Sequence, residues 1–178
     1  MTAPIRFFVE GLPAPKGSTS SFQHKTTGAI ITMASNPKEQ KSWRERIQPE
    51  ARKHFPQRSN EPFSVALSFI FDRPKGHFTP KGKLRPAAPR YKITAPDTDK
   101  LTRCVLDALT NIVFCDDRQV VYVSGYKRFA EEGEKPGAWI TITPRTSAQQ
   151  PPENCTVASA ASGRPSEASY TGESPGGP

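Results

Sequence analysis

Large apolar side chains are nearly absent from the last segment of this chain. From Thr146 to Pro178 the sequence is rich in serine, proline, glycine and alanine, with hardly any residue that could join a core. Such a segment buries too little apolar surface to offset the entropy that it would lose on folding. We therefore expect one folded domain over residues 1–145, which is a usual domain length, and a disordered tail over residues 146–178.

The residues before the tail alternate short apolar runs with turn signals, which is typical of an α+β domain. The clearest strand is Phe63–Phe71, because its large apolar residues alternate with smaller ones. Two closing strands are expected, joined by the charged turn 131–137, at Val120–Phe129 and Ala138–Thr143. Shorter strands are expected at Ile5–Val9 and Ala29–Met33. Together these strands predict a mixed β-sheet.

Two helices are indicated between the strands. The first begins at Asn36 and Pro37, a cap residue followed by proline at the first helical position, and Pro49 should end or kink it. Its Trp43 is expected in the core or in a dimer interface. The second begins near Pro96, and its apolar residues recur at helical spacing. They are Leu101, Val105, Ala108, Leu109 and Ile112.

The polar side of the second helix carries three charged residues four positions apart. They are Asp99, Arg103 and Asp107. Because residues at this spacing are neighbours on a helix, we expect an ion pair between Arg103 and Asp107.

The chain is basic, with a net charge of +8. The tail has one arginine and three glutamates, which leaves 24 basic and 14 acidic residues, or +10, for residues 1–145. A surplus of this size favours a polyanionic partner such as nucleic acid. The segment from Arg73 to Lys92 contains seven basic residues and no acidic one. It is either a solvated linker or a binding loop.

Several other classes are excluded or disfavoured. No apolar run approaches the length of a membrane-spanning helix, so no membrane partner is expected, and the N-terminus lacks the pattern of a secretory signal. The cysteines form no Cys-x-x-Cys pair, and the histidines His24, His54 and His77 have no acid or cysteine at ligand spacing. A reduced protein of the cytoplasm, without zinc, is the expectation.

Four aspartates carry the strongest chemical signal. Asp97 and Asp99 open the second helix, and Asp116 and Asp117 precede the strand at Val120. Capping alone would explain Asp97, but clustered carboxylates repel each other unless a cation joins them. Oxygen ligands favour Mg²⁺, with Mn²⁺ as a substitute, over zinc. With a basic loop nearby, such a site suggests phosphodiester hydrolysis.

The aspartates also lie in a recognisable order. The run Pro96–Leu109, which contains Asp97-Thr98-Asp99 and Asp107-Ala108-Leu109, is followed by Asp116-Asp117-Arg118-Gln119-Val120-Val121. This order resembles the signature of the RusA family of Holliday junction resolvases, small endonucleases of phages and prophages. A weaker echo is the turn Gly11–Lys16. The resemblance implies a RusA-like α+β fold and a homodimer that cuts four-way DNA junctions in recombination and repair.

The resemblance also implies roles for individual residues. Asp97, Asp99 and Asp117, contributed by the paired subunits, would be catalytic and bind Mg²⁺, and Asp116 would orient or supplement them. Arg103 stands where the family commonly has a catalytic lysine, and Lys100 where it often has asparagine. Arginine keeps the charge stabilisation of that lysine but cannot transfer a proton. The basic loop would contact DNA and stay disordered until DNA arrives. The predicted DNA contacts are Lys16, Lys75, Lys81, Lys83, Arg85, Lys100 and Lys127.

Two other interpretations remain open at this stage. One is a less specific nuclease that uses the same acids on flaps or other branched DNA. The other is a non-catalytic nucleic-acid-binding protein, in which the aspartates only cap, turn and pair with Arg103. Cleavage in the presence of a divalent metal separates the second interpretation from the nuclease.

Overall fold

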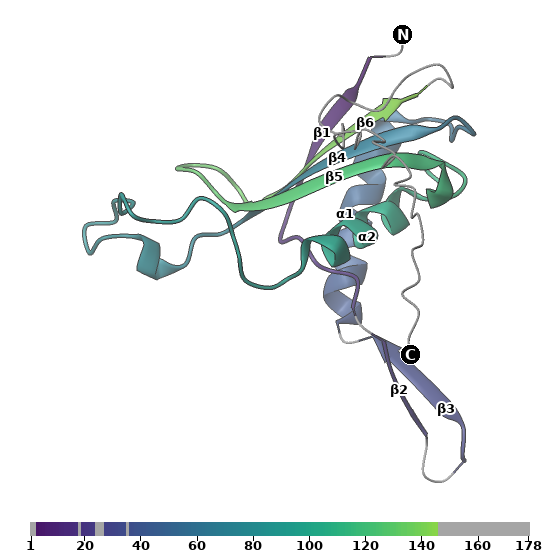
Figure 1. Cartoon of the computed structure of the whole chain (residues 1–178), viewed down its shortest axis with the longest axis horizontal. Coiled ribbons are helices and arrows are strands. Elements are labelled where there is room, and N and C mark those ends of the chain that lie inside the picture. Colours follow the sequence, from purple (N-terminus) through teal and green to yellow (C-terminus); the bar gives the residue numbers. More distant parts are fainter. Residues whose placement is uncertain (1–2, 18, 24–26, 35, 146–178) are drawn as a thin grey trace, which may run out of the picture.

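The structure is a computed structural model that describes residues 3–17, 19–23, 27–34 and 36–145. Its centre is a four-stranded mixed sheet (Figure 1). The strand order is β1 (Ile5–Glu10), β6 (Gly137–Pro144), β4 (Phe63–Phe71) and β5 (Val120–Phe129). Only the β4–β5 pair is parallel. The α+β class and the mixed sheet are therefore confirmed. The predicted tail lies outside the described residues.

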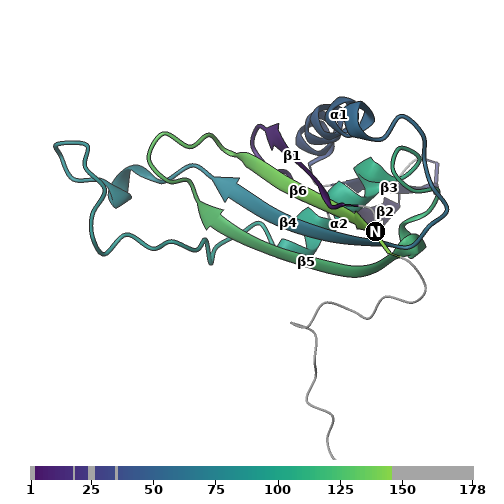
Figure 2. The same ribbon diagram turned by 90° about the horizontal axis from the view of Figure 1, so that it is seen from above.

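Helices α1 (Pro37–His54) and α2 (Thr98–Leu109) pack on the same face of this sheet (Figure 2). The apolar stripe predicted for the second helix is buried, and α1 contributes Trp43, Ile47 and Ala51 to the same core. The sheet meets them with side chains such as Phe7, Leu67 and Ile140. Trp43 is thus a core residue. Among the described residues, no helix is both long and apolar enough to cross a membrane.

Strand β4 lies between the two closing strands of the sheet. Those two strands, β5 and β6, form as expected but do not pair with each other, because β4 lies between them. Every residue of β4 except Ala66 is buried. A strand that is buried along almost its whole length needs a neighbouring strand on each side, which explains its place between β5 and β6.

Of the two expected effects of Pro49, an end or a kink of helix α1, the structure contradicts the first, because the helix continues past the proline. The helix continues to His54 and closes where the amide of Phe55 donates to the carbonyl of Ala51. The buried face of α1 extends past the proline, with Ile47 before it and Ala51 after it. Packing of this face offsets the single hydrogen bond that proline cannot make.

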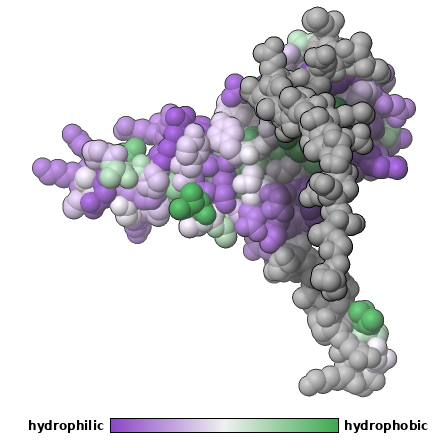
Figure 3. Space-filling model, in the orientation of Figure 1, coloured by the Kyte–Doolittle hydropathy of each residue, from purple (hydrophilic) through white to green (hydrophobic). Residues whose placement is uncertain are grey.

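Two segments project from the body of the domain (Figure 1). One is an antiparallel pair of strands, β2 (Thr19–Gln23) and β3 (Ile30–Ala34), of which only β3 was expected. The other contains the basic segment Arg73–Lys92, which includes a short 3₁₀ helix, η1 (Lys75–His77), and is mostly hydrophilic (Figure 3).

The basic segment was expected to be disordered, and the structure shows instead a folded excursion. Backbone hydrogen bonds join Thr79 to Lys83 and His77 to Arg85. At the base, the Arg73 guanidinium donates to the carbonyls of Ala130 at 2.7 Å and Pro89 at 2.9 Å. These bonds satisfy backbone groups that a mobile loop would leave to water.

Gly137 is a position where the sheet has no room for a side chain. A Cβ placed there would collide with the carbonyl oxygen of Val9 and the ring of Phe8. We expect Gly137→Ala to lower the free energy of unfolding by about 1–3 kcal/mol, because the clash involves backbone of the paired strand. Urea unfolding followed by circular dichroism measures it. Gly76→Ala, which meets nothing within 4 Å, is the control, and equal stability of the two variants would contradict the prediction.

Candidate functional site

Asp97 and Asp99 lie at the N-terminus of α2, and both side chains are exposed. Asp97 occupies the cap position but makes no capping hydrogen bond with its side chain. Its carboxylate is instead 2.9 Å from the ammonium of Lys100. Hydrogen bonding to Lys100 lowers the pKa of Asp97, and the same contact raises the pKa of Lys100. The pair keeps Asp97 ionised, the form that binds a metal, so capping does not account for this residue.

Lys127 supports the backbone that leads into this pair. Its ammonium donates to the carbonyl of Thr94 at 2.7 Å and to that of Pro96 at 2.6 Å. The peptide bond between Ala95 and Pro96 is cis. Lys127 was predicted to contact DNA, but in the structure its donors serve the backbone that positions Asp97.

A second lysine lies beside Lys127. Lys92 donates to the hydroxyl of Thr94 at 2.7 Å. Partial burial, and then the neighbouring Lys127 charge, lower the pKa of Lys92. Two lysine ammonium groups, those of Lys92 and Lys127, thus contact the short stretch of chain that leads to Asp97.

Asp116 and Asp117 begin the short 3₁₀ helix η2 (Asp117–Gln119) in the connection between α2 and β5. Asp116 caps this helix: its carboxylate accepts from the amide of Arg118 at 2.9 Å and from the Arg118 guanidinium at 3.0 Å. These bonds lower the pKa of Asp116 from 3.8 to about 2. Asp116 thus holds the turn together, whereas the carboxylate of Asp117 is exposed.

The side chain of Gln119, the last residue of the Asp-Asp-x-Gln motif, forms hydrogen bonds with four backbone groups around the turn. Its amide oxygen accepts from the backbone amides of Cys115 at 2.8 Å and Asp116 at 3.0 Å. Its amide nitrogen donates to the carbonyls of Ser59 and Glu61, each at 2.9 Å. This one side chain fixes the turn to the segment before β4.

The two aspartate pairs lie at opposite ends of α2. Strand β5 returns alongside the helix, so Lys127 reaches Pro96 at the N-terminus of α2, and Gly125 faces Thr102. The strand starts at Val120, next to Asp117. The 12 residues of α2 span about 18 Å. In keeping with this separation, no three His, Cys, Asp or Glu side chains within the described residues are grouped closely enough to hold a metal ion.

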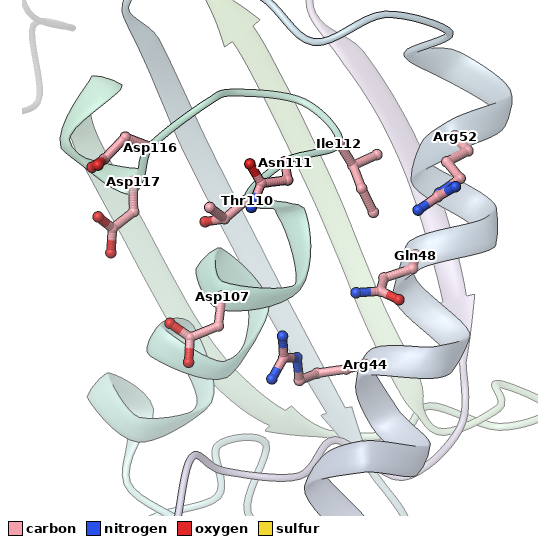
Figure 4. A pocket seen from close by; sticks show the side chains of 9 residues that line it. All are labelled: Arg44, Gln48, Arg52, Asp107, Thr110, Asn111, Ile112, Asp116 and Asp117. Atoms are coloured by element: carbon pink, nitrogen blue, oxygen red, sulfur yellow. The ribbon is translucent and has the colours of Figure 1, made fainter.

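Asp117 instead lines an open pocket of about 490 Å³ between α1, the end of α2 and the turn that follows (Figure 4). Carboxylates lie on the α2 side, and polar side chains of α1 lie opposite them. The α1 residues are Arg44, Gln48 and Arg52. They were not among the predicted site residues, although their four-residue spacing places them on one side of the helix.

Asp107 lies in the same pocket, and its partner differs from the expectation. Its carboxylate is 2.7 Å from the ammonium of Lys16 and does not pair with Arg103. The expected ion pair on α2 is thus wrong. The amide of Lys16 also donates to the carbonyl of Lys100 at 2.9 Å. Both the backbone and the side chain of Lys16 therefore contact α2. Arg103 is exposed one turn after Asp99 and makes no ion pair with a described residue.

The remaining predicted DNA contacts are all exposed on the basic segment. They are Lys75, Lys81, Lys83 and Arg85. Arg85 donates to the carbonyl of Phe78 at 3.0 Å. Their charges face solvent on a segment with no acid from Arg73 to Lys92.

The family model described as endodeoxyribonuclease RusA matches residues 12–143, which include both projecting segments and all four aspartates. No curated protein matches the chain.

The capping role of Asp116 predicts a pH effect on stability. The pKa of Asp116 is lower in the folded chain than its ordinary 3.8, so its contribution is complete above about pH 4 and is lost as the pH falls towards 2. We expect Asp116→Asn to be less stable than the wild type at pH 5, with the difference shrinking at pH 2 to 3. Urea midpoints across this range measure it. Asp117→Asn is the control, and a pH-independent difference for Asp116→Asn would contradict the assignment.

Proposed function

Because the chain belongs to the RusA family of endodeoxyribonucleases, we propose that it is a Mg²⁺-dependent enzyme that resolves four-way DNA junctions by paired symmetric nicks. The observation that carries the proposal is the exposed pair Asp97 and Asp99 beside a basic segment without acidic residues, with the Asp97 carboxylate held ionised by Lys100. The reaction is phosphodiester hydrolysis, in DNA recombination and repair.

The donor set fits a hard cation. Mg²⁺ is commonly held by one or two carboxylates, with water and substrate phosphate completing its shell, and Mn²⁺ accepts the same ligands. Asp97 and Asp99 supply two such carboxylates at one helix terminus. When bound, the metal would activate water and stabilise the leaving 3′ oxygen.

We further propose that the third carboxylate comes from a second subunit. Within one chain Asp117 is separated from Asp99 by the length of α2, yet it is exposed and its turn is rigidly fixed by Asp116 and Gln119. In a homodimer, the partner subunit's Asp117 could reach the N-terminus of α2. Two such composite sites would serve two symmetric strands of a junction.

The chain's own residues supply positioning and charge. Arg103, one turn from Asp99, would stabilise negative charge as the phosphate reacts, without donating a proton. Lys100 keeps Asp97 ionised and Lys127 fixes the backbone before it. The exposed cations of the basic segment would hold the flanking phosphates.

A second candidate is a non-catalytic DNA-binding protein. Two contacts favour it in part, the capping hydrogen bond of Asp116 and the ion pair of Asp97. They give two of the four aspartates a structural role that requires no metal. It predicts junction binding without divalent ions and no strand scission in any metal.

The composite site predicts that two inactive variants restore each other. Asp99→Asn and Asp117→Asn should each bind a labelled four-way junction but not cleave it in Mg²⁺. In a mixed dimer, one of the two sites receives both mutations and the other receives neither. Mixing the variants after partial unfolding and refolding should therefore restore single nicks, which denaturing electrophoresis detects.

The other outcomes are equally informative. A site built within one chain would leave the mixture inactive, which would contradict the composite site. Active single variants would contradict the role of the aspartates in catalysis. Mixed wild-type and Asp99→Asn protein is the control for exchange of subunits.

The basic segment predicts a change in salt dependence. Replacing Lys75, Lys81, Lys83 and Arg85 by glutamine should reduce the slope of log K against log salt for junction binding, by roughly 0.9 for each phosphate that the variant no longer neutralises. Replacement of Lys38 and Lys41, exposed on α1, should leave the slope unchanged. An unchanged slope in the quadruple variant would refute the role of the segment in DNA binding.

A further inference from the structure

The face of the sheet opposite the two helices carries a row of paired residues, here called the aromatic row, that crosses all four strands and is aromatic on three of them. Phe8 pairs with Trp139, Trp139 pairs with Ser68, and Ser68 pairs with Tyr126. Directly paired residues share a face of the sheet. The residues next to them in sequence, such as Phe7, Leu67 and Ile140, point to the other side and form the core with the helices.

Solvent reaches this face of the sheet at two places. One is the β5 end of the aromatic row, and the other is the neighbouring row of paired residues. Tyr126 is 51% exposed. Ala66, at the centre of the next row, is the single exposed residue of β4. That row is otherwise made of Arg6, Thr141 and Ser124. Small residues beside large rings leave room for a flat ligand.

The same face is basic. The guanidinium of Arg6 lies 4.3 Å from the centre of the Trp139 ring. The Arg145 guanidinium donates to the hydroxyl of Ser64 at 2.6 Å. Glu10 is the single acidic residue of the four strands, and Lys135 pairs with it at 2.9 Å.

An unsatisfied polar group lies within the aromatic row. Ser68 is 9% exposed, and its hydroxyl has no hydrogen-bond partner among the described residues. A buried polar group without a partner is costly, and a bound molecule is one way to satisfy it. Its register position is between Trp139 and Tyr126.

We propose that this open face binds single-stranded nucleic acid, with bases stacked on Tyr126 and Trp139 and phosphates near Arg6 and Arg145. Rings set beside arginines on a sheet favour unpaired bases, because stacking requires an exposed base face and the arginines attract the backbone. A duplex hides its base faces. A second copy of this chain would bring the arginines of two basic faces together. In the proposed function, the face would hold strands that unpair at the exchange point of a junction.

Binding of a short fluorescein-labelled DNA strand, followed by anisotropy in EDTA, tests the proposal. Tyr126→Ala should weaken binding about tenfold. Val123→Ala is the matched control, since this residue is exposed on the same strand but belongs to the face covered by the helices. Unchanged binding by Tyr126→Ala, or an equal loss in Val123→Ala, would overturn the proposal.

Tryptophan emission gives a second readout that locates the strand. Trp43 is buried at 1% exposure, so quenching by DNA reports on Trp139. We expect quenching in the wild type and in the variant that lacks Lys75, Lys81, Lys83 and Arg85, but none in Trp139→Phe. An absence of quenching in the quadruple variant would place the strand on the basic segment instead.

Light scattering tests the alternative occupant of this face, which is a second copy of the chain. If Tyr126→Ala changed the mass of the protein while DNA affinity stayed the same, the face would be an interface between copies of the chain, and the proposal would be wrong. Because EDTA removes the metal, a result with single-stranded DNA does not depend on whether the aspartates catalyse cleavage.

Discussion

The burial of β4 on both faces is the constraint from which the rest of this structure follows. A strand with only Ala66 exposed must be central, so β6 and β5 lie on either side of it. The β5 partner is parallel, and a parallel neighbour requires a crossover that returns the chain to the starting edge. The basic segment and α2 are that crossover. Asp97 and Asp99 therefore lie at the N-terminus of α2, and Asp117 lies beyond its C-terminus.

The same topology divides the molecule into two chemically different sides. Both helices cover one face of the sheet, and with them come the aspartates and Arg103. The other face is left with aromatic rings, hydroxyl groups and arginines. Under the proposed function, the side with the aspartates would cut one strand and the opposite face would hold another, so the two opposed surfaces of one sheet would serve both tasks.

Much of this arrangement is predictable from local patterns in the sequence, and the rest depends on contacts between distant residues. The apolar stripe of α2 and the alternation of β4 reveal their own elements, because helical and strand periods are local properties. The pairing of Asp107 with Lys16 joins residues far apart in the chain, so spacing along α2 could not reveal it. Strand β2 has few apolar residues in the sequence TSSFQ, which leaves it without a clear signal. The separation of the aspartate pairs follows from the path of β5, which no motif encodes.

Lys127 has a mechanical consequence for the site. Its one ammonium group holds the carbonyls of both Thr94 and Pro96, and these residues connect the projecting basic segment to Asp97. Displacement of the segment is therefore transmitted to β5 through Lys127 and along the chain to Asp97. The basic segment and the carboxylate of Asp97 therefore share one point of attachment to the sheet, the ammonium group of Lys127.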